Sequence, residues 1–158
     1  MGELLSGDGD GDLFMYEAIG EGAYRLTWKE EDQQPPADAR LVGGGADLDG
    51  DGMVEFIVGR LYQDPYEVQQ TRWRIEVYQA AGDNSFRREW QTEALGGKAG
   101  GNGINMGDWD GDGEVDFAVA LPPHLYVFSA SGPDTYGPVW QRAAGDVHQP
   151  AKIGRAHV

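Results

Sequence analysis

The sequence contains no cysteine, few basic residues and no long apolar run, and each absence excludes something. Without cysteine in its 158 residues, the chain forms no disulfides, and redox chemistry says nothing about its compartment. Its 12 lysines and arginines stand against 27 aspartates and glutamates, a net charge of −15. This balance argues against a nucleic acid partner, because phosphates would be repelled. No apolar run approaches the ~18 residues of a spanning helix, so we expect no membrane insertion within this segment.

Glycine is abundant, with 25 residues, which favours turns and strands over helices. An alternating apolar stretch occurs three times, at residues 12–18, 74–80 and 124–130. A glycine, an aromatic residue and a tryptophan follow each copy at the same spacing. They are Gly20, Tyr24 and Trp28; Gly82, Phe86 and Trp90; and Gly132, Tyr136 and Trp140. Agreement at this many positions indicates a repeated structural unit.

A second short apolar run lies upstream of each copy, at residues 3–7, 55–59 and 116–120, and begins with an acid each time. Residues 39–46 supply a further strand before the middle copy. Alternation with aromatic and branched side chains is typical of strands, and repeated four-stranded units are typical of propeller blades. The sequence therefore predicts an all-β fold of about three β-propeller blades. Each blade would be a four-stranded antiparallel sheet, the first one incomplete.

The repeats also predict how the chain is organised. We expect a partial β-propeller over residues 1–152, in which variable surface connectors join the strands. The longest connector is expected from Arg60 to Trp73. The last six residues, 153–158, resemble the translation of a common sequencing adapter, and we expect them to be a non-native tail. The blade repeats are placed at about 3–30, 39–92 and 102–145.

Two acidic loops, Asp47–Glu55 and Asp108–Asp116, precede the short runs of the middle and third copies. Both have acids at positions 1, 3, 5 and 9 and glycine at position 6. In a tight loop, alternate positions direct their carboxylates inward, and the glycine permits the reversal that turns the carbonyl of position 7 inward. Four adjacent carboxylates repel one another without a cation. Because Ca²⁺ takes about six to eight oxygen ligands, whereas Mg²⁺ keeps its waters, the loops indicate calcium.

A nine-residue acidic loop that runs directly into a short apolar strand resembles the FG-GAP/VCBS-type repeat of integrin α-subunit propellers. In that family the loop joins the first two strands of a blade and holds one Ca²⁺, so the resemblance implies two calcium sites. Glu55 stands where the family more often has aspartate, and it is long enough to reach. By position, the implied ligands are the side chains of Asp47, Asp49, Asp51 and Glu55 with the Met53 carbonyl, and those of Asp108, Asp110, Asp112 and Asp116 with the Glu114 carbonyl.

Other motifs have simpler interpretations. An EF-hand would need a glutamate at loop position 12 and flanking helices, but Val58 and Val119 occupy that position and a strand follows. The Gly-Asp run at residues 7–12 resembles a further calcium loop, yet it falls in a connector, and we interpret it as a flexible acidic turn. The glycine-rich residues 96–103 lack the ending of a phosphate-binding loop.

The remaining aromatic and basic side chains give no catalytic constellation. The repeated tryptophans are expected to pack between blades, whereas Trp109, opposite Leu48 in the other loop, has no assigned role. The three histidines form no cluster with metal-ligand spacing, and no nucleophile–base pair is recognisable.

The leading hypothesis is a calcium-stabilised binding or adhesion module that presents surface loops to a protein or glycan. The family resemblance implies an extracellular or cell-surface location. The alternative is the propeller part of a calcium-dependent polysaccharide-degrading enzyme, such as a lyase. In that case basic side chains and exposed calcium would neutralise a uronate. The candidate side chains are Arg72, Arg74, Arg87 and Arg88.

Overall fold

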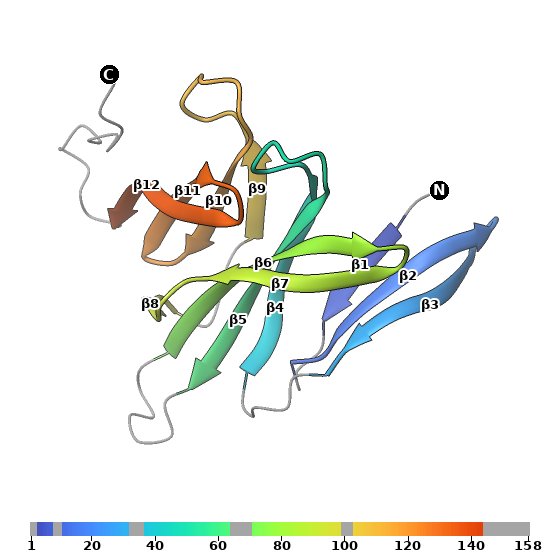
Figure 1. Cartoon of the computed structure of the whole chain (residues 1–158). Helices are drawn as coiled ribbons and strands as arrows, with labels where there is room; N and C mark the ends of the chain where they lie inside the picture. The colour runs from blue at the N-terminus through green and yellow to red at the C-terminus, as the bar shows by residue number, and fades with distance from the viewer. Residues whose placement is uncertain (1–2, 8–10, 32–36, 64–70, 99–102, 144–158) are drawn as a thin grey trace.

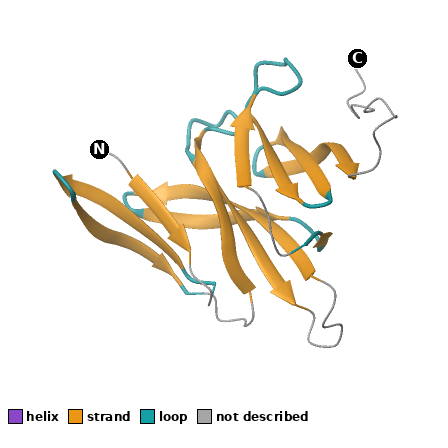
Figure 2. Cartoon of the chain, turned by 180° about the vertical axis from the view of Figure 1, so that it is seen from behind, coloured by secondary structure: helices purple, strands orange, loops and turns teal. Residues whose placement is uncertain are grey.

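The computed structural model describes residues 3–7, 11–31, 37–63, 71–98 and 103–143, and within these ranges the chain is all-β (Figures 1 and 2). The strands form three antiparallel sheets, each of which follows the order of the chain. The described part contains no helix of the length and apolarity needed to cross a membrane. The predicted all-β class and the antiparallel blades are therefore confirmed.

We call the three sheets blade 1, blade 2 and blade 3, and Figure 1 shows blade 2 between the other two. Blade 1 has three described strands, whereas blades 2 and 3 each have a four-stranded path. Blade 1 contains β1 (Glu3–Gly7), β2 (Leu13–Gly20) and β3 (Ala23–Glu30). Blade 2 contains β4 (Ala37–Ala46), β5 (Glu55–Gln63), β6 (Thr71–Gly82), β7 (Ser85–Gln91) and the short β8 (Leu95–Gly96), which pairs with β6. Blade 3 contains β9 (Gly103–Gly107), β10 (Asp116–Leu121), β11 (His124–Gly132) and β12 (Thr135–Ala143).

The last hairpin of every blade has the same register, which explains the repeated spacing in the sequence. Trp28, Trp90 and Trp140 lie opposite Met15, Val77 and Val127, respectively, on the neighbouring strand. A register shift lies next to each tryptophan on the side of the turn, and the turn places Gly22, Asn84 or Asp134 at positive φ. Glycine, asparagine and aspartate tolerate that backbone conformation better than other residues.

Strand β4 lies at the inner edge of blade 2, next to β9 of blade 3 and β1 of blade 1. The approach to β9 depends on a glycine: a Cβ atom built on Gly43 would lie 2.8 Å from the Ile104 side chain. Such a distance forbids a larger residue without movement of a strand. The inner strands β4 and β9 can therefore lie this close together because residue 43 is a glycine.

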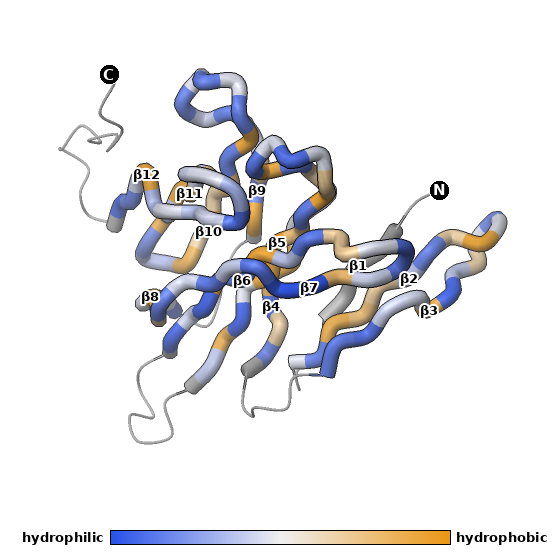
Figure 3. The backbone as a smooth tube through the Cα atoms, in the orientation of Figure 1, coloured by the Kyte–Doolittle hydropathy of each residue, from blue (hydrophilic) through white to orange (hydrophobic). Residues whose placement is uncertain are grey.

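The hydrophobic core lies between the blades. Figure 3 shows hydrophobic segments in β4, β5 and β9, whereas the outer strand β7 is mostly hydrophilic. One buried cluster joins side chains of blades 1 and 2, and another joins side chains of blades 2 and 3. Between blades 1 and 2, Trp28 packs edge-on against Phe86 at 5.5 Å between ring centroids. Between blades 2 and 3, Trp90 packs edge-on against Tyr136 at the same separation, 5.5 Å. The predicted packing role is thus confirmed for Trp28 and Trp90.

Trp140 lies on the far side of blade 3, where the described residues bring no further blade against it. It lines a hollow of about 450 Å³ together with Ala118, Val127 and the half-exposed Trp109. Trp140 occupies the position in blade 3 that Trp90 occupies in blade 2. Blade 3 covers the face of blade 2 that carries Trp90, and the face that carries Trp140 is its equivalent on blade 3.

The predicted connector from Arg60 to Trp73 is wrong at both ends, because β5 continues to Gln63 and β6 begins at Thr71. Arg60 is 1% exposed, donates from Nε to Glu76 at 2.7 Å and also binds the Gly11 carbonyl. The charge of Arg60 suggested that a loop begins there, but Arg60 lies within β5 and its charge is neutralised by Glu76. Burial alone would raise the pKa of Glu76, yet Arg60, followed by Arg74 and Arg88, holds it below the usual value.

The buried Arg60–Glu76 pair yields a stability prediction. Glu76→Gln removes the negative partner and leaves the buried guanidinium uncompensated, which should lower the free energy of unfolding by about 3–5 kcal/mol. Urea denaturation followed by circular dichroism measures it. The control is Glu17→Gln, which breaks an ion pair with the 62% exposed Arg25 and should cost less than about 1 kcal/mol. Equal effects of the two changes would contradict the assigned role of Glu76.

The aromatic boundary between blades 2 and 3 yields a second prediction. Trp90→Ala should lower the free energy of unfolding by about 3 kcal/mol, because it opens a cavity against Phe128 and Tyr136. Trp109→Ala changes a side chain that is 56% exposed and should cost about 0.5 kcal/mol or less. Thermal melts of both variants make the comparison, and a Trp109 effect as large as that of Trp90 would refute this view of the core.

Candidate metal centre

The loop that joins β4 to β5 is folded around its own carboxylates. Both oxygens of Asp47 accept backbone hydrogen bonds, Oδ1 from Gly50 at 2.8 Å and Oδ2 from Gly52 at 3.0 Å. Asp49 accepts from the amide of Asp51 at 3.2 Å, and Asp51 accepts from the amide of Met53 at 2.7 Å. Each of these aspartate side chains thus accepts a hydrogen bond from a backbone amide further along the loop and stabilises the turn there.

The loop that joins β9 to β10 repeats this arrangement position by position. Asp108 accepts from Gly111 at 2.6 Å and from Gly113 at 2.9 Å. Asp110 and Asp112 accept from the amides two residues further on, at 3.2 and 2.9 Å. Two loops of different sequence therefore reach the same geometry through the same backbone contacts.

The glycines make these turns possible. Gly50 and Gly52 have φ values of 79° and 90°, and their counterparts Gly111 and Gly113 have 80° and 89°. L-residues with side chains rarely adopt such values, whereas glycine adopts them without steric conflict. The glycine at loop position 6, singled out from the sequence, is therefore required by the backbone, and the one at position 4 is as well.

The structure brings together the acids at positions 1, 3 and 9 of each loop. One oxygen each from Asp47, Asp49 and Glu55 lies within 4.8 Å of the others. The same holds for Asp108, Asp110 and Asp116.

The acids at position 5 are placed differently. Asp51 accepts from Gln79 at 2.7 Å and groups with Asp49 and a third acid described below. Asp112 belongs to no such group among the described residues. The carbonyls of Met53 and Glu114 remain predicted ligands, and the amides of the same two residues donate to Asp51 and Asp112.

The acid at position 9 links each loop to the sheet through one carboxylate oxygen, and its other oxygen makes no hydrogen bond. Glu55 and Asp116 are both fully buried at the start of their strands. Oε2 of Glu55 accepts from the amide of Leu48 at 2.6 Å, and Oδ2 of Asp116 accepts from the amide of Trp109 at 3.0 Å. The other oxygen of each carboxylate, Oε1 or Oδ1, is buried without a hydrogen-bond partner.

A buried carboxylate oxygen without a partner is unfavourable unless a cation or a proton reaches it. Burial is the largest cause that raises the pKa of Glu55 to about 7, and the neighbouring Asp49 adds to it. Without a cation, this carboxylate would therefore be only partly ionised near neutral pH. A metal ion among the three acids would supply the missing positive charge.

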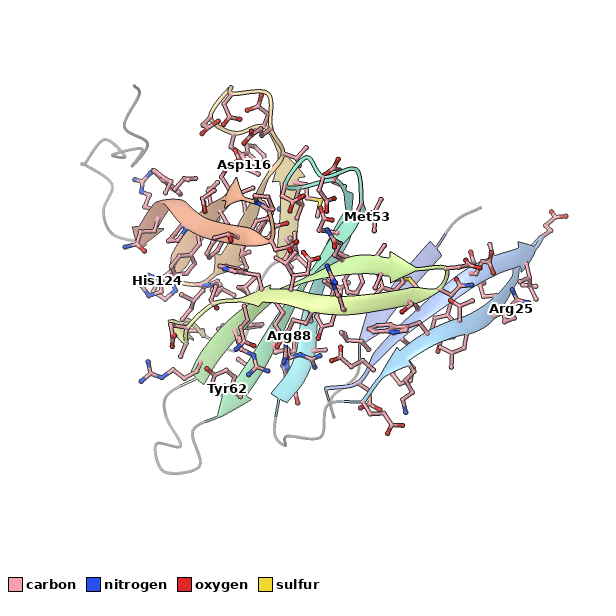
Figure 4. The ribbon with its side chains drawn as sticks, viewed as in Figure 1. Arg25, Met53, Tyr62, Arg88, Asp116 and His124 are labelled. Atoms are coloured by element: carbon pink, nitrogen blue, oxygen red, sulfur yellow. The ribbon has the colours of Figure 1, made fainter. Side chains whose placement is uncertain are left out.

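The two loops lie at one end of the molecule, as the positions of Met53 and Asp116 in Figure 4 show. Asp49 of the first loop and Glu114 of the second line the same hollow, together with residues 129–132 of the β11–β12 hairpin. The candidate ligands of both loops are therefore presented on a common surface next to a turn of blade 3.

Two acids near the first loop were missed by sequence reasoning. Asp134, in the turn between β11 and β12, donates its amide to Oδ2 of Asp49 at 2.8 Å, across 85 residues of sequence. Glu89 of β7 has a side chain that is 2% exposed. The repeat alignment carried a signal, because Glu89 stands where the other copies have Thr27 and Val139.

Of the other sequence candidates, Arg87 lies near the first loop, because it donates to Gln79, which in turn donates to Asp51. Of the four arginines considered for an enzyme, Arg74 and Arg88 bind the buried Glu76 at 2.7 and 3.0 Å, and Arg87 lies 3.6 Å from Glu89. His124 contacts Tyr126. Residues 8–10 of the Gly-Asp run and the predicted tail at 153–158 lie outside the described residues.

The comparisons with known proteins agree with this geometry. A family model described as an FG-GAP-like repeat matches residues 47–119, a span that begins at Asp47 and contains both acidic loops. Neither the curated proteins nor the solved structures contain a significant match. Residues 47–119, which run from the acidic loop of blade 2 into β10 of blade 3, are thus similar to an FG-GAP-like repeat.

Proposed function

We propose that this propeller-type module binds Ca²⁺ at its two acidic loops and presents surface loops to a protein or glycan partner outside the cell. The observation that carries the proposal is the buried, unpartnered oxygen of Glu55 and of Asp116. Each lies in a group with two further carboxylates of its own loop. One cation in each group would satisfy that oxygen and relieve the repulsion within the group.

The donor chemistry supports calcium. Only oxygen donors are grouped at each loop, and Ca²⁺ is a hard cation that accepts such ligands in irregular arrangements. Mg²⁺ requires nearly octahedral geometry and gives up its waters reluctantly. Zn²⁺ prefers histidine and cysteine ligands, whereas the described groups contain only aspartate and glutamate.

The proposed role of the ion is structural. Each loop connects two strands of a blade, and both acids at position 9 begin the second of these strands, β5 or β10. An ion would fix the loop to the sheet and keep the exposed turn in one conformation. For a secreted or cell-surface role in binding or adhesion, we expect each site to bind Ca²⁺ with a Kd of about 10⁻⁴–10⁻³ M, the range of calcium modules outside cells.

The position 9 acids allow a sharp test of calcium binding. Glu55→Gln and Asp116→Asn retain a carbonyl oxygen that accepts the amide of Leu48 or Trp109, but each places an amide group where the free carboxylate oxygen lies. The double variant should melt in EDTA at or above the temperature of the unchanged chain, because two buried charges are gone. In CaCl₂ the unchanged chain should gain about 2.7 kcal/mol per site at a hundredfold excess over Kd.

For a chain of this size, each kcal/mol of added stability raises the Tm by roughly 2–4 °C. The double variant should lose most of the rise in Tm that CaCl₂ gives to the unchanged chain. Thermal melts by circular dichroism in CaCl₂, MgCl₂ and EDTA measure all three states, with MgCl₂ as the control for a general ionic effect. A folded chain with one Tm in all three solutions would refute the calcium proposal.

A further inference from the structure

The turn between β11 and β12 of blade 3 reaches the acidic loop of blade 2, as Figure 1 shows. Besides the backbone contact to Asp49, this turn brings a third carboxylate to the loop. One oxygen each from Asp49, Asp51 and Asp134 lies within 4.8 Å of the others. This group is distinct from that of Asp47, Asp49 and Glu55, and Asp49 belongs to both.

Glu89 adds a buried carboxyl group beside this group of acids. Its side chain is 2% exposed, and neither carboxylate oxygen has a hydrogen-bond partner. Its carboxylate faces that of Asp134, and burial, followed by this neighbour, raises the pKa of Glu89 to about 8. The Arg87 guanidinium, 3.6 Å away on a side chain that is 62% exposed, offers only weak compensation.

The buried hydroxyl of Tyr136 belongs to the same region. It also lacks a hydrogen-bond partner. Burial, followed by the charges of Glu55, Asp49, Glu89 and Asp134, raises its pKa. The boundary between blades 2 and 3 thus gathers oxygen atoms from both blades, and buried polar atoms are ordinarily paired.

The equivalent boundary between blades 1 and 2 provides an internal comparison. There the repeat places Thr27, Asn84 and Phe86 where this boundary has Glu89, Asp134 and Tyr136. Asn84 adopts the same positive φ, 53°, as Asp134, so the turn itself does not require a charge. Aromatic packing does not require the Tyr136 hydroxyl either, because Phe86 makes the equivalent ring contact at the other boundary.

We propose that a further calcium ion lies between blades 2 and 3, held by Asp49, Asp51 and Asp134, with Glu89 beside Asp134 as the fourth carboxylate. This inference rests on the proposed calcium binding of the loops and extends it from a device within one blade to a clamp between two. Asp49 couples the clamp to the ion of its own loop. Without the ion, repulsion between the loop and the turn opposes the docking of blade 3.

The test counts the ions bound by the whole 158-residue chain. Equilibrium dialysis against CaCl₂ followed by elemental analysis should find three Ca²⁺ in the unchanged chain. The Glu89→Gln/Asp134→Asn variant should hold one fewer. Asn is tolerated at this turn position, as Asn84 shows. The matched control is Asp83→Asn, which removes an exposed acid from the corresponding turn of blade 2 and should leave the count unchanged.

A melting experiment separates ion binding from a purely structural role. In EDTA the double variant should melt at or above the temperature of the unchanged chain, because repulsion at the boundary is relieved, and its gain in CaCl₂ should be smaller. An unchanged ion count in the double variant would overturn the boundary site while the loop sites stand. A chain that binds no Ca²⁺ at all would overturn the loop sites as well.

Discussion

Carboxylates held close together at the ends of strands are the constraint on which this structure depends. Glu55 and Asp116 each end a loop of acids, and backbone amides of the same loop hold the first acid, Asp47 or Asp108, in place. Between exposed side chains in water, this repulsion would be weak. Glu55 and Asp116 are buried, so the repulsion between each of them and the other acids of its own loop is poorly screened. In the proposed calcium-bound state, a divalent cation in each loop would offset this repulsion and would couple folding to the ion.

The blades themselves are joined by packing and by internal charge pairing. No disulfide links them, so the contacts of Trp28 and Trp90 with the next blade carry the association. Arg60 adds a polar contact, because it binds Glu76 within blade 2 and the carbonyl of Gly11 at the edge of blade 1. At the other boundary, acids of blades 2 and 3 face one another. At this second boundary, the proposed ion would offset the negative charge of these acids.

Much of the fold could be predicted because three copies of one pattern locate the strands more reliably than a single copy does. The spacing of Gly82, Phe86 and Trp90 reports a hairpin register that all three blades share. The position of Arg60 could not be predicted, since its neutralising partner is 16 residues away on another strand. Asp134 was missed for the same reason: it meets Asp49 only after two blades have formed and packed. Local sequence encodes each acidic loop, whereas contacts between blades depend on tertiary structure.

The most direct test of the account is a crystal structure of the chain grown in CaCl₂, with anomalous scattering used to locate the ions. The account predicts one anomalous peak among Asp47, Asp49 and Glu55 and another among Asp108, Asp110 and Asp116. Oxygen ligands should lie at about 2.3–2.6 Å from each. A third peak is predicted beside Asp134. Ordered loops that contain only water at the first two positions would contradict the central claim, because the buried carboxylates would then be stable without a metal.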